Sequence, residues 1–281
     1  MNTVEDLHVH TRISKDSKED PEKYIVKAIE RGIEYLGFSD HIDLDPKDKD
    51  FGFYRYEDAR QSYIELKEKY NNGLSLFFAT EVTYQNNIEK SIQNNLQGRP
   101  YDYIIGSIHR LEGYTISSPR GIQFFNGKDE TTAYSIYFEE VDRMINTGFF
   151  DIVGHFDVLK RYGNSIYGTF NANRFEAIIV PLMKKIVAKN LVIEINSSGF
   201  RHKLSEQYPS NDILRMYRDC GGREITIGSD AHNASQFGVY MEETLKNALS
   251  IFDFNIVVFA QRKKIKLSRL SELLSKNKVG R

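Results

Sequence analysis

Short apolar runs alternate along the chain with longer segments in which apolar residues recur every three or four positions. The short runs are rich in β-branched and aromatic residues and predict strands, whereas the longer segments predict amphipathic helices. This alternation recurs about seven times and is typical of repeated βα units, which build a parallel sheet. The predicted strands are residues 4–8, 35–39, 74–79, 103–107, 150–154, 191–195 and 225–228, with residues 255–260 as a candidate eighth.

Two of the intervening helices carry recognisable end signals. Asp20 suits an N-cap, Pro21 suits a first turn and Gly32 suits a helix end, so we expect a helix between them. Asn173 has a glutamate three positions later, as in a capping box, and predicts another helix start. Pro181 lies inside that second pattern, and we expect it to kink or split the helix.

The chain shows no division into separate parts. No linker rich in proline, glycine or serine is visible, so residues 1–281 are predicted to form one domain. Irregular stretches at 43–50, 112–130 and 196–208 predict loops that cover or shape a site. Residues 262–281 are basic, and we interpret them as a solvated terminal helix or tail. A nucleic-acid-binding tail is the alternative, but no aromatic platform is interleaved with the charges.

Composition excludes several classes of protein. Hydrophobic residues make up 40% and charged residues 27%, as in folded soluble proteins. The formal net charge is −1, so no global positive field attracts nucleic acid or anionic lipid. The single cysteine, Cys220, excludes an intrachain disulfide and a cysteine-rich zinc module, and we interpret it as an ordinary residue near a helix end. Neither a secretory signal nor an apolar run of ~20 residues is visible, so we expect a cytoplasmic protein without a membrane partner.

Metal-ligand residue types lie at or just beyond the carboxyl ends of most predicted strands. In a β/α barrel these ends share one rim, where active sites are built. Side chains that are far apart in the sequence are therefore expected to converge. The candidates are His8 and His10 at the first strand, Asp40 and His41 at the second, Glu81 at the third, His109 at the fourth, His155 at the fifth, and Asp230 and His232 at the seventh. Of the seven histidines, only His202 lies elsewhere.

The spacing of these residues favours a shared cation site. His8 and His10 are two positions apart, which places both rings on one face of an extended strand, and Asp230 and His232 repeat this spacing. Glu81 has two carboxylate oxygens with which it can bridge two cations; the alternative is that it caps the following turn. Mixed imidazole and carboxylate ligands suit zinc, manganese or iron rather than magnesium or calcium.

A set of short motifs identifies a family resemblance. The motifs are Asp6-Leu-His8-Val-His10-Thr11, Ser39-Asp40-His41, Thr80-Glu81, Gly106-Ser-Ile-His109, Gly154-His155-Phe-Asp157 and Gly228-Ser-Asp-Ala-His232. Together they resemble the PHP (polymerase and histidinol phosphatase) family over residues 6 to about 238. The length of the chain and its residues 104–110 look most like the stand-alone histidinol-phosphate phosphatases of that family.

The resemblance implies a distorted (β/α)7 TIM-like barrel that holds three divalent transition metal ions at the carboxyl ends of its strands. By motif position, the ligands of the first metal are His8, His10, Glu81 and Asp230, those of the second are Glu81, His109 and His155, and those of the third are Asp16, His41 and His232. For Asp16, a role as a turn residue is the alternative. Asp40 is expected to orient a ligand imidazole, and Asp157 either does the same or forms a salt bridge.

The reaction that follows from such a centre is hydrolysis of a phosphate monoester. A cation pair that shares Glu81 would lower the pKa of a bridging water, and the resulting hydroxide would attack phosphorus directly, without a phosphoenzyme. We expect Asp230, Glu81 and His232 to be catalytic. The proton for the leaving group comes either from Asp230 or from a metal-bound water.

Phosphate also requires charged partners from the chain. Arg161 and Arg201 follow strand-end segments, and arginine offers a planar, permanently charged fork, so we predict that both bind phosphate. Lys160 and Arg120 are weaker candidates.

Substrate identity is implied by the resemblance alone. It implies L-histidinol phosphate as the substrate, in histidine biosynthesis. The acids Asp43, Asp45 and Glu112 and the aromatic-rich residues 51–56 suit its ammonium and imidazole groups. Three alternatives stay open: a PHP-type phosphoesterase acting on nucleotides or nucleic-acid ends, a phosphotyrosine phosphatase, and a metal-stabilised binding module without catalysis. The near-neutral charge disfavours a nucleic-acid partner, and the oligomeric state stays open.

Overall fold

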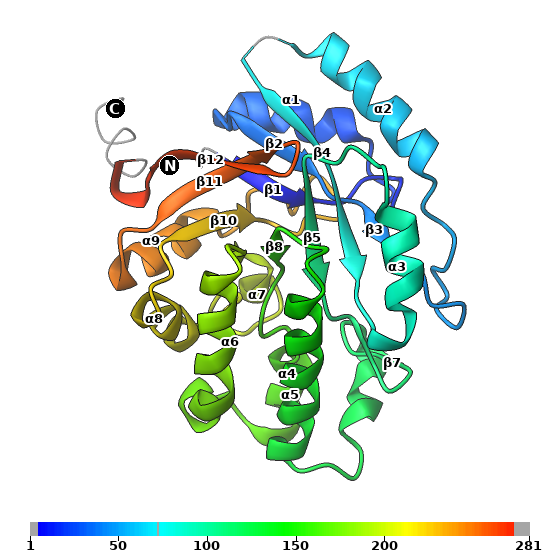
Figure 1. Ribbon diagram of the computed structural model, residues 1–281. Helices are drawn as coiled ribbons and strands as arrows, with labels where there is room; N and C mark the ends of the chain where they lie inside the picture. The colour runs from blue at the N-terminus through cyan, green and yellow to red at the C-terminus, as the bar shows by residue number, and fades with distance from the viewer. Residues whose placement is uncertain (1–4, 72, 273–281) are drawn as a thin grey trace.

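Seven parallel strands form the centre of the molecule (Figure 1). The computed structural model describes residues 5–71 and 73–272. In the order of the sheet, the strands are β1 (Glu5–Val9), β2 (Tyr35–Phe38), β4 (Ser75–Thr83), β5 (Tyr103–Ser107), β8 (Ile152–Val153), β9 (Val192–Asn196) and β10 (Glu224–Gly228). Neighbours in this series pair in parallel, which confirms the predicted α/β class. Strand ends differ from the prediction by a few residues, most of all at β4, which continues to Thr83.

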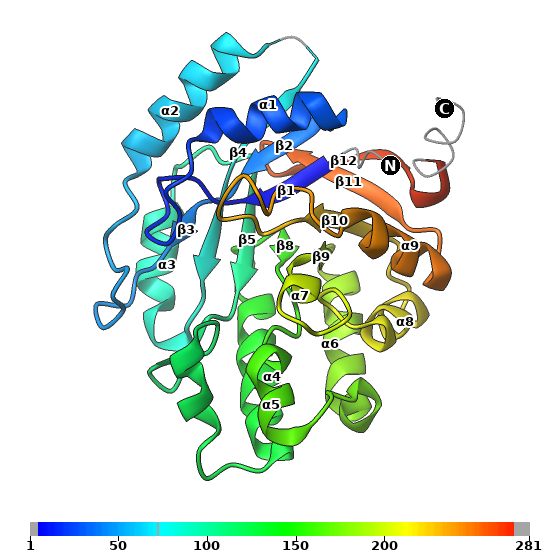
Figure 2. The same cartoon turned by 180° about the vertical axis from the view of Figure 1, so that it is seen from behind.

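Helices lie around the outside of these strands, as the two opposite views in Figures 1 and 2 show. They are α1 (Pro21–Arg31), α2 (Tyr56–Lys69), α3 (Glu89–Leu96), α4 (Glu130–Asn146), α5 (Lys160–Tyr167), α6 (Glu176–Ala188), α7 (Ser198–Arg201), α8 (Asn211–Asp219) and α9 (Met241–Ile251). The prediction for α1 is confirmed, because Asp20 caps its first turn and Gly32 ends it in the left-handed region with φ 66°. Cys220 directly follows α8, as predicted for a residue near a helix end.

The start of α6 differs from the prediction. Asn171, and not Asn173, caps a short 3-10 helix, η3 (Ala172–Phe175), and α6 begins directly after it. Pro181 lies inside α6 and does not split it. A proline removes one main-chain hydrogen bond, but tertiary packing supplies most helical stability, and Leu182 beside it is buried in the core.

The two ends of the strand series meet where β1 lies beside β10. An isolated parallel bridge links Val9 with Ala231. Nearer the amino ends of the two strands, a side chain links them, because the buried carboxylate of Glu5 accepts the main-chain N–H of Ile227 at 2.8 Å. The seven parallel strands of the predicted barrel are therefore confirmed, and its first and last strands meet at an irregular seam without a continuous ladder among the described residues.

An antiparallel hairpin crosses the amino ends of the parallel strands (orange to red in Figure 1). It consists of β11 (Asn255–Ala260) and β12 (Lys263–Arg269). In its turn, the N–H of Arg262 donates to the carbonyl of Asp102, just before β5, and the guanidinium donates to the carbonyl of Phe149, just before β8. Apolar side chains of β11 pack into the apolar interior. The hairpin thus closes the barrel at the end opposite the candidate ligands.

This hairpin corrects two predictions. Residues 255–260 form a strand, as predicted, but it leaves the parallel series after two paired residues beside β10. Residues 262–281 were predicted to be a terminal helix or tail, and this is wrong for residues 263–269, which form β12. The main-chain partners offered by β11 outweigh local sequence preference there. Residues 273–281 lie outside the described residues.

Short elements also lie in the connections between these strands and helices. They are β3 (His41–Ile42), η1 (Asn86–Ile88), β6 (Arg110–Leu111), β7 (Tyr114–Thr115) and η2 (Pro119–Phe125). β3 is paired to β4, and β6 with β7 forms a separate two-stranded sheet. Among the described residues, no helix has the length and apolar character needed to cross a membrane.

Candidate metal centre

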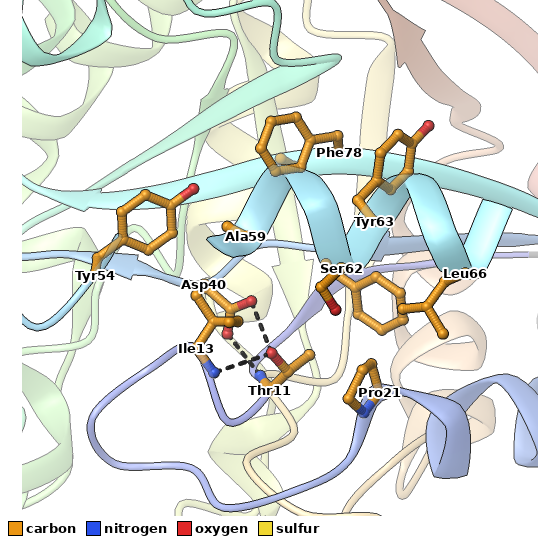
Figure 3. A pocket seen from close by; sticks show the side chains of 12 residues that line it. Thr11, Ile13, Pro21, Asp40, Tyr54, Ala59, Ser62, Tyr63, Leu66 and Phe78 are labelled. Atoms are coloured by element: carbon orange, nitrogen blue, oxygen red, sulfur yellow. Dashed lines mark hydrogen bonds between the residues drawn. The ribbon is translucent and has the colours of Figure 1, made fainter. Parts of the chain in front are cut away.

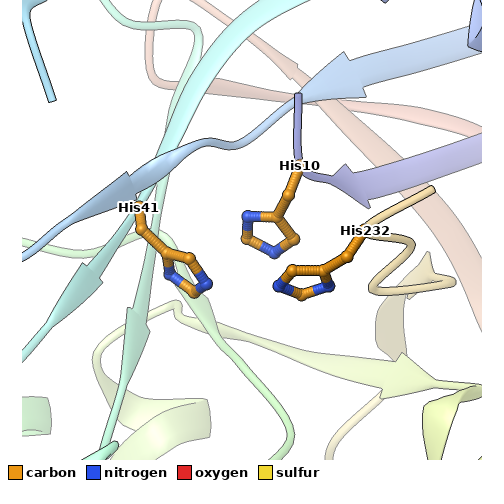
Figure 4. Close-up of side chains that lie close together, drawn as sticks. All are labelled: His10, His41 and His232. Atoms are coloured by element: carbon orange, nitrogen blue, oxygen red, sulfur yellow. The ribbon is translucent and has the colours of Figure 1, made fainter. Parts of the chain in front are cut away.

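Ligand-type side chains converge at the carboxyl ends of the parallel strands. They form three overlapping groups, and within each group the ligand atoms lie within 4.8 Å of one another. The groups are His8, His10 and Asp230; His41, Glu81 and His109; and His10, His41 and His232. Figure 4 shows the last group, with three rings from three separate segments pointing toward a common space. Segments that are more than 200 residues apart in sequence thus meet at one centre.

Strand geometry explains why Glu81 points into this centre. Phe77, Ala79 and Glu81 share one face of β4, and the first two pack in the apolar interior. Glu81 therefore stands above an apolar layer and inside the strand, rather than beyond its end as predicted. The register of β3 on β4 pairs His41 with Glu81, which brings that histidine to the same place.

The carboxylate of Glu81 stands between two sets of imidazoles. Its Oε1 lies 2.9 Å from Nε2 of His155 and 3.4 Å from Nε2 of His109. Its Oε2 lies 3.2 Å from Nε2 of His8 and 3.0 Å from Nδ1 of His41. Nε2 of His10 also lies 3.6 Å from Oε2. Because each oxygen faces a different set of rings, the geometry suits a carboxylate that is shared between two cations.

Asp16 belongs to a third set of side chains. Its Oδ2 lies 3.1 Å from Nε2 of His232 and 3.5 Å from Nε2 of His41. The side chain of Asp16 is 41% exposed, whereas that of His41 is 13% exposed, so this set lies at the open side of the centre. Asp16 lies in a turn, which is its alternative role, and its carboxylate also faces two imidazoles.

Three of the six imidazoles of the centre have a close partner on the nitrogen that faces away from it. Metal-binding histidines usually need such a partner, which selects the tautomer and orients the ring. The pairs are His8 Nδ1 with Glu194 Oε1 at 2.5 Å, His109 Nδ1 with Thr83 Oγ1 at 3.0 Å, and His232 Nδ1 with the main-chain oxygen of Asp230 at 3.1 Å. In each of these rings Nε2 faces the centre.

Asp40 does not contact an imidazole directly. Its carboxylate accepts the N–H and the hydroxyl of Thr11 at 2.6 and 2.9 Å, and the hydroxyl of Ser14 at 2.8 Å. It therefore anchors the loop after β1. Asp157 forms a salt bridge, which is one of its two predicted roles, because its Oδ2 lies 2.9 Å from Nζ of Lys160.

The charges of the centre compensate one another. Burial raises the pKa of Glu81, but the surrounding imidazoles, led by His8, outweigh it and hold that pKa well below its usual value. Burial lowers the pKa of His8, but the carboxylates of Glu194 and Glu81 outweigh it and raise that pKa well above its usual value. For His10, burial and the charge of His41 act together and lower the pKa. Protons thus balance the carboxylates, and a bound cation would release protons.

The centre passes a direct test of whether a cation fits it. Buried polar atoms normally have hydrogen-bond partners. Four that face the centre make no hydrogen bond of suitable geometry among the described residues, although Glu81 Oε2 lies within 3.2 Å of two of the nitrogens. They are His8 Nε2, His10 Nε2, His41 Nδ1 and Glu81 Oε2. A cation would satisfy these nitrogens and this oxygen together. The mixture of donors fits a divalent transition metal.

The centre forms the floor of a polar cavity of about 120 Å³. Arg161 lines one wall, where its guanidinium donates to the main-chain oxygen of Ser117 at 2.9 Å. The carboxylates of Asp43, Asp48 and Asp50 also line the cavity. The cavity thus combines a cationic group with an acidic side, which suits a ligand that carries both signs of charge.

The other predicted phosphate partners differ in their access to the cavity. Arg201 lies beside Asp230, to whose main-chain oxygen it donates at 2.8 Å, and its Nη1 has no hydrogen-bond partner in the described chain. Lys160 is fully buried and paired with Asp157 and Glu206, so its weaker candidacy as a phosphate partner is wrong. A buried ion pair holds such a lysine away from a ligand.

Three residues of the site escaped sequence reasoning. Glu194 is the charged residue of the otherwise uncharged β9, the strand for which no candidate ligand was found, and this combination was a usable signal. His202 lines the cavity, and burial, followed by the charge of Arg161, lowers its pKa to about 3, so its ring is neutral at neutral pH. Ser14 gave no signal, because hydroxyl groups are common in loops.

Comparisons with known proteins agree with this fold. The family model of the PHP domain matches residues 6–198. A probable histidinol-phosphatase of Deinococcus radiodurans is 24% identical over 94% of this chain and 99% of its own length, and the histidinol-phosphatase of Lactococcus lactis is 26% identical over 82% and 85%. The crystal structure of histidinol phosphate phosphatase from Lactococcus lactis, complexed with zinc, L-histidinol and phosphate, has the same fold. It matches with a TM-score of 0.83 over 95% of this chain and all of that one, at 22% identity. The chain belongs to the PHP domain family.

Proposed function

We propose that the protein is a metal-dependent phosphate monoester hydrolase that converts L-histidinol phosphate and water into L-histidinol and phosphate. The observation that carries this proposal is the cluster of histidines and carboxylates around buried Glu81, on the floor of a cavity lined by Arg161. The names of similar proteins support the substrate, and one of them was crystallised with L-histidinol and phosphate. Asp43, Asp48 and Asp50 suit the cationic groups of such a substrate.

We assign three cations to the centre. The first is held by His8, His10, Glu81 and Asp230, the second by Glu81, His109 and His155, and the third by Asp16, His41 and His232. The two oxygens of Glu81 face different imidazoles, which supports a shared ligand, and Asp16 lies within 3.5 Å of both histidines of its set. When bound, such cations polarise the phosphoryl group and lower the pKa of water.

The chain itself supplies charge and proton transfer around the phosphoryl group. Arg161 and Arg201 bind its oxygens, because a guanidinium offers paired donors to phosphate. Asp230 transfers the proton, since its side chain is 16% exposed and lines the cavity, whereas that of Glu81 is 1% exposed. His232 assists, because its Nδ1 lies 3.6 Å from Oδ1 of Asp230 and its charge helps to hold the pKa of that carboxylate below its usual value.

The proposal is tested by metal content and substrate preference on one preparation. Elemental analysis should find close to three transition metal ions per chain, and phosphate release should be far faster from L-histidinol phosphate than from p-nitrophenyl phosphate or a nucleoside monophosphate. The variant Asp230→Asn should lose at least about a hundredfold in kcat/KM, in the range for a removed acid or base, whereas exposed Asp219→Asn should match the wild type.

Three results would contradict the proposal in different ways. Metals with activity only on another ester would overturn the substrate, and a phosphorylated protein trapped during turnover would overturn direct attack by water. No bound metal after reconstitution would overturn the whole assignment.

A further inference from the structure

We propose that Ser14 and Asp40 are positioning residues that orient the imidazole of His10 and hold the loop that carries Asp16. This inference rests on the proposed function, because it concerns how the chain prepares its cation ligands. Neither residue is placed as a ligand. Ser14 lies in the loop between β1 and α1, and Asp40 lies between β2 and β3.

Asp40 fixes the conformation of this loop. Asp40 is 5% exposed, and three donors converge on its carboxylate: the N–H of Thr11, the hydroxyl of Thr11 and the hydroxyl of Ser14. Figure 3 shows the two contacts with Thr11. The hydroxyl of Thr11 also accepts the N–H of Ile13 at 3.2 Å. These contacts pin residues 11, 13 and 14, and Asp16 follows two positions later. A free loop would have to be ordered at an entropic cost when a cation bound.

Ser14 connects the anchored loop to two candidate ligands. Its hydroxyl donates to Oδ1 of Asp40 at 2.8 Å and accepts the main-chain N–H of His41 at 3.0 Å. The same oxygen lies 3.4 Å from Nδ1 of His10. The oxygen of this buried hydroxyl thus links the loop to His41 at the start of β3 and to His10 directly after β1.

The single hydroxyl proton of Ser14 determines which tautomer of His10 can bind to it. A hydroxyl has one proton to donate and two lone pairs with which it can accept. Since the proton goes to Asp40, the contact with His10 requires a proton on Nδ1 of that ring. Nε2 then keeps its lone pair, and this is the atom of His10 that faces the centre, 3.3 Å from Oδ1 of Asp230. Asp40, acting through Ser14, therefore keeps the proton of His10 on Nδ1, as Glu194 does directly for His8.

The substitution Ser14→Ala tests this role. It removes one buried hydroxyl and leaves the loop without its link to His10 and His41. Metal-free protein would be titrated with Zn²⁺ against a chelating dye, so the readout needs no substrate. We expect at least one class of bound zinc to weaken by roughly 10- to 100-fold, the usual range for the loss of an outer partner of a ligand.

A matched control comes from the same region. Ser62 lies on α2 and lines the small cavity that Asp40 also lines, so Ser62→Ala is the same chemical change nearby (Figure 3). Its zinc affinity should equal that of the wild type. Nitrogen NMR of the histidine rings adds a direct readout, because Ser14→Ala should raise the fraction of His10 that carries its proton on Nε2 in the metal-free protein.

Two variants of Asp40 complete the test. Asp40→Ala removes all acceptors and should weaken zinc binding at least as much as Ser14→Ala. Asp40→Asn keeps one acceptor oxygen, and the hydroxyl of Thr11 can turn to accept from the amide, so this variant should recover part of the affinity. Such a partial rescue is expected of a positioning residue.

The possible failures can be told apart. If the wild type binds no zinc, the proposed function fails. If the wild type binds zinc and Ser14→Ala, folded by its melting curve, binds it equally well with the same His10 tautomer, then only the positioning role of Ser14 is overturned. If Asp40→Ala equals the wild type, the anchoring role of Asp40 is overturned.

Discussion

Substitution of Glu194 by glutamine should weaken zinc binding while leaving the fold intact. Glutamine has the size of glutamate, but one terminal oxygen becomes an NH₂ donor. In the structure, Oε1 of Glu194 faces Nδ1 of His8 at 2.5 Å, and Oε2 accepts from the N–H of His155 at 2.8 Å and from Nδ2 of Asn196 at 3.1 Å. All partners of the carboxylate are donors when His8 carries its proton on Nδ1. Glutamine cannot accept from all of them.

In either orientation of the new amide, its NH₂ group faces another hydrogen-bond donor. With its oxygen toward His155, the NH₂ group faces His8, and the ring relieves the conflict by moving its proton to Nε2, where a cation needs the lone pair. With its oxygen toward His8, the NH₂ group faces two buried donors. An unsatisfied buried donor costs about 1–3 kcal/mol, and about 1.4 kcal/mol corresponds to tenfold in Kd, so the expected loss of affinity is roughly 5- to 150-fold.

The assay is a competition titration of metal-free protein with Zn²⁺ and a chelating dye. Glu140→Gln is the matched control, because Glu140 is also buried and also accepts a main-chain N–H, that of Asn86 at 2.6 Å, but it lies on α4 and does not line the metal cavity. It should melt at a lower temperature yet bind zinc as the wild type does. An unchanged zinc affinity in folded Glu194→Gln would refute the reasoning from donors and acceptors.

Three further substitutions have distinct expected outcomes. Burial raises the pKa of Glu5 well above its usual value, so the folded state holds this proton to higher pH than the unfolded chain and loses stability as pH rises. The metal-free variant Glu5→Gln cannot titrate at this position, so its free energy of unfolding in urea should fall less between pH 5 and pH 8 than that of the wild type. An equal loss would refute this. Arg161→Met should lower kcat/KM for a phosphate monoester by roughly 10- to 150-fold, from about 1.5–3 kcal/mol for a charged hydrogen bond, whereas the exposed Arg60→Met on α2 should not. Gly228→Ala should cost about 1–3 kcal/mol of stability through overpacking, because the added Cβ would lie 2.2 Å from Oε1 of Glu194; a wild-type urea midpoint would contradict that contact.

The sequence by itself determined the parallel α/β fold and the convergence of the candidate ligands. Both follow from short-range patterns. Apolar runs of strand length alternate with helical segments, and chain chirality and connection rules then place the carboxyl ends of parallel strands on one rim. His8 and His10 share a face because side chains alternate along a strand, and Glu81 points inward for the same reason. The structure brings these side chains together as that pattern predicts.

Only the tertiary structure decided which side chain faces which partner. The contact of His8 with Glu194 spans 186 positions and depends on the irregular closure of the barrel, which no local pattern encodes. Asp40 binds the loop of Thr11 and Ser14 rather than an imidazole, because hydrogen-bond partners depend on side-chain positions within a few tenths of an ångström. Residues 263–269 form a strand because β11 offers them main-chain partners. Residue types and their spacing are local properties of a chain, whereas hydrogen-bond partners and tautomers are properties of its packing.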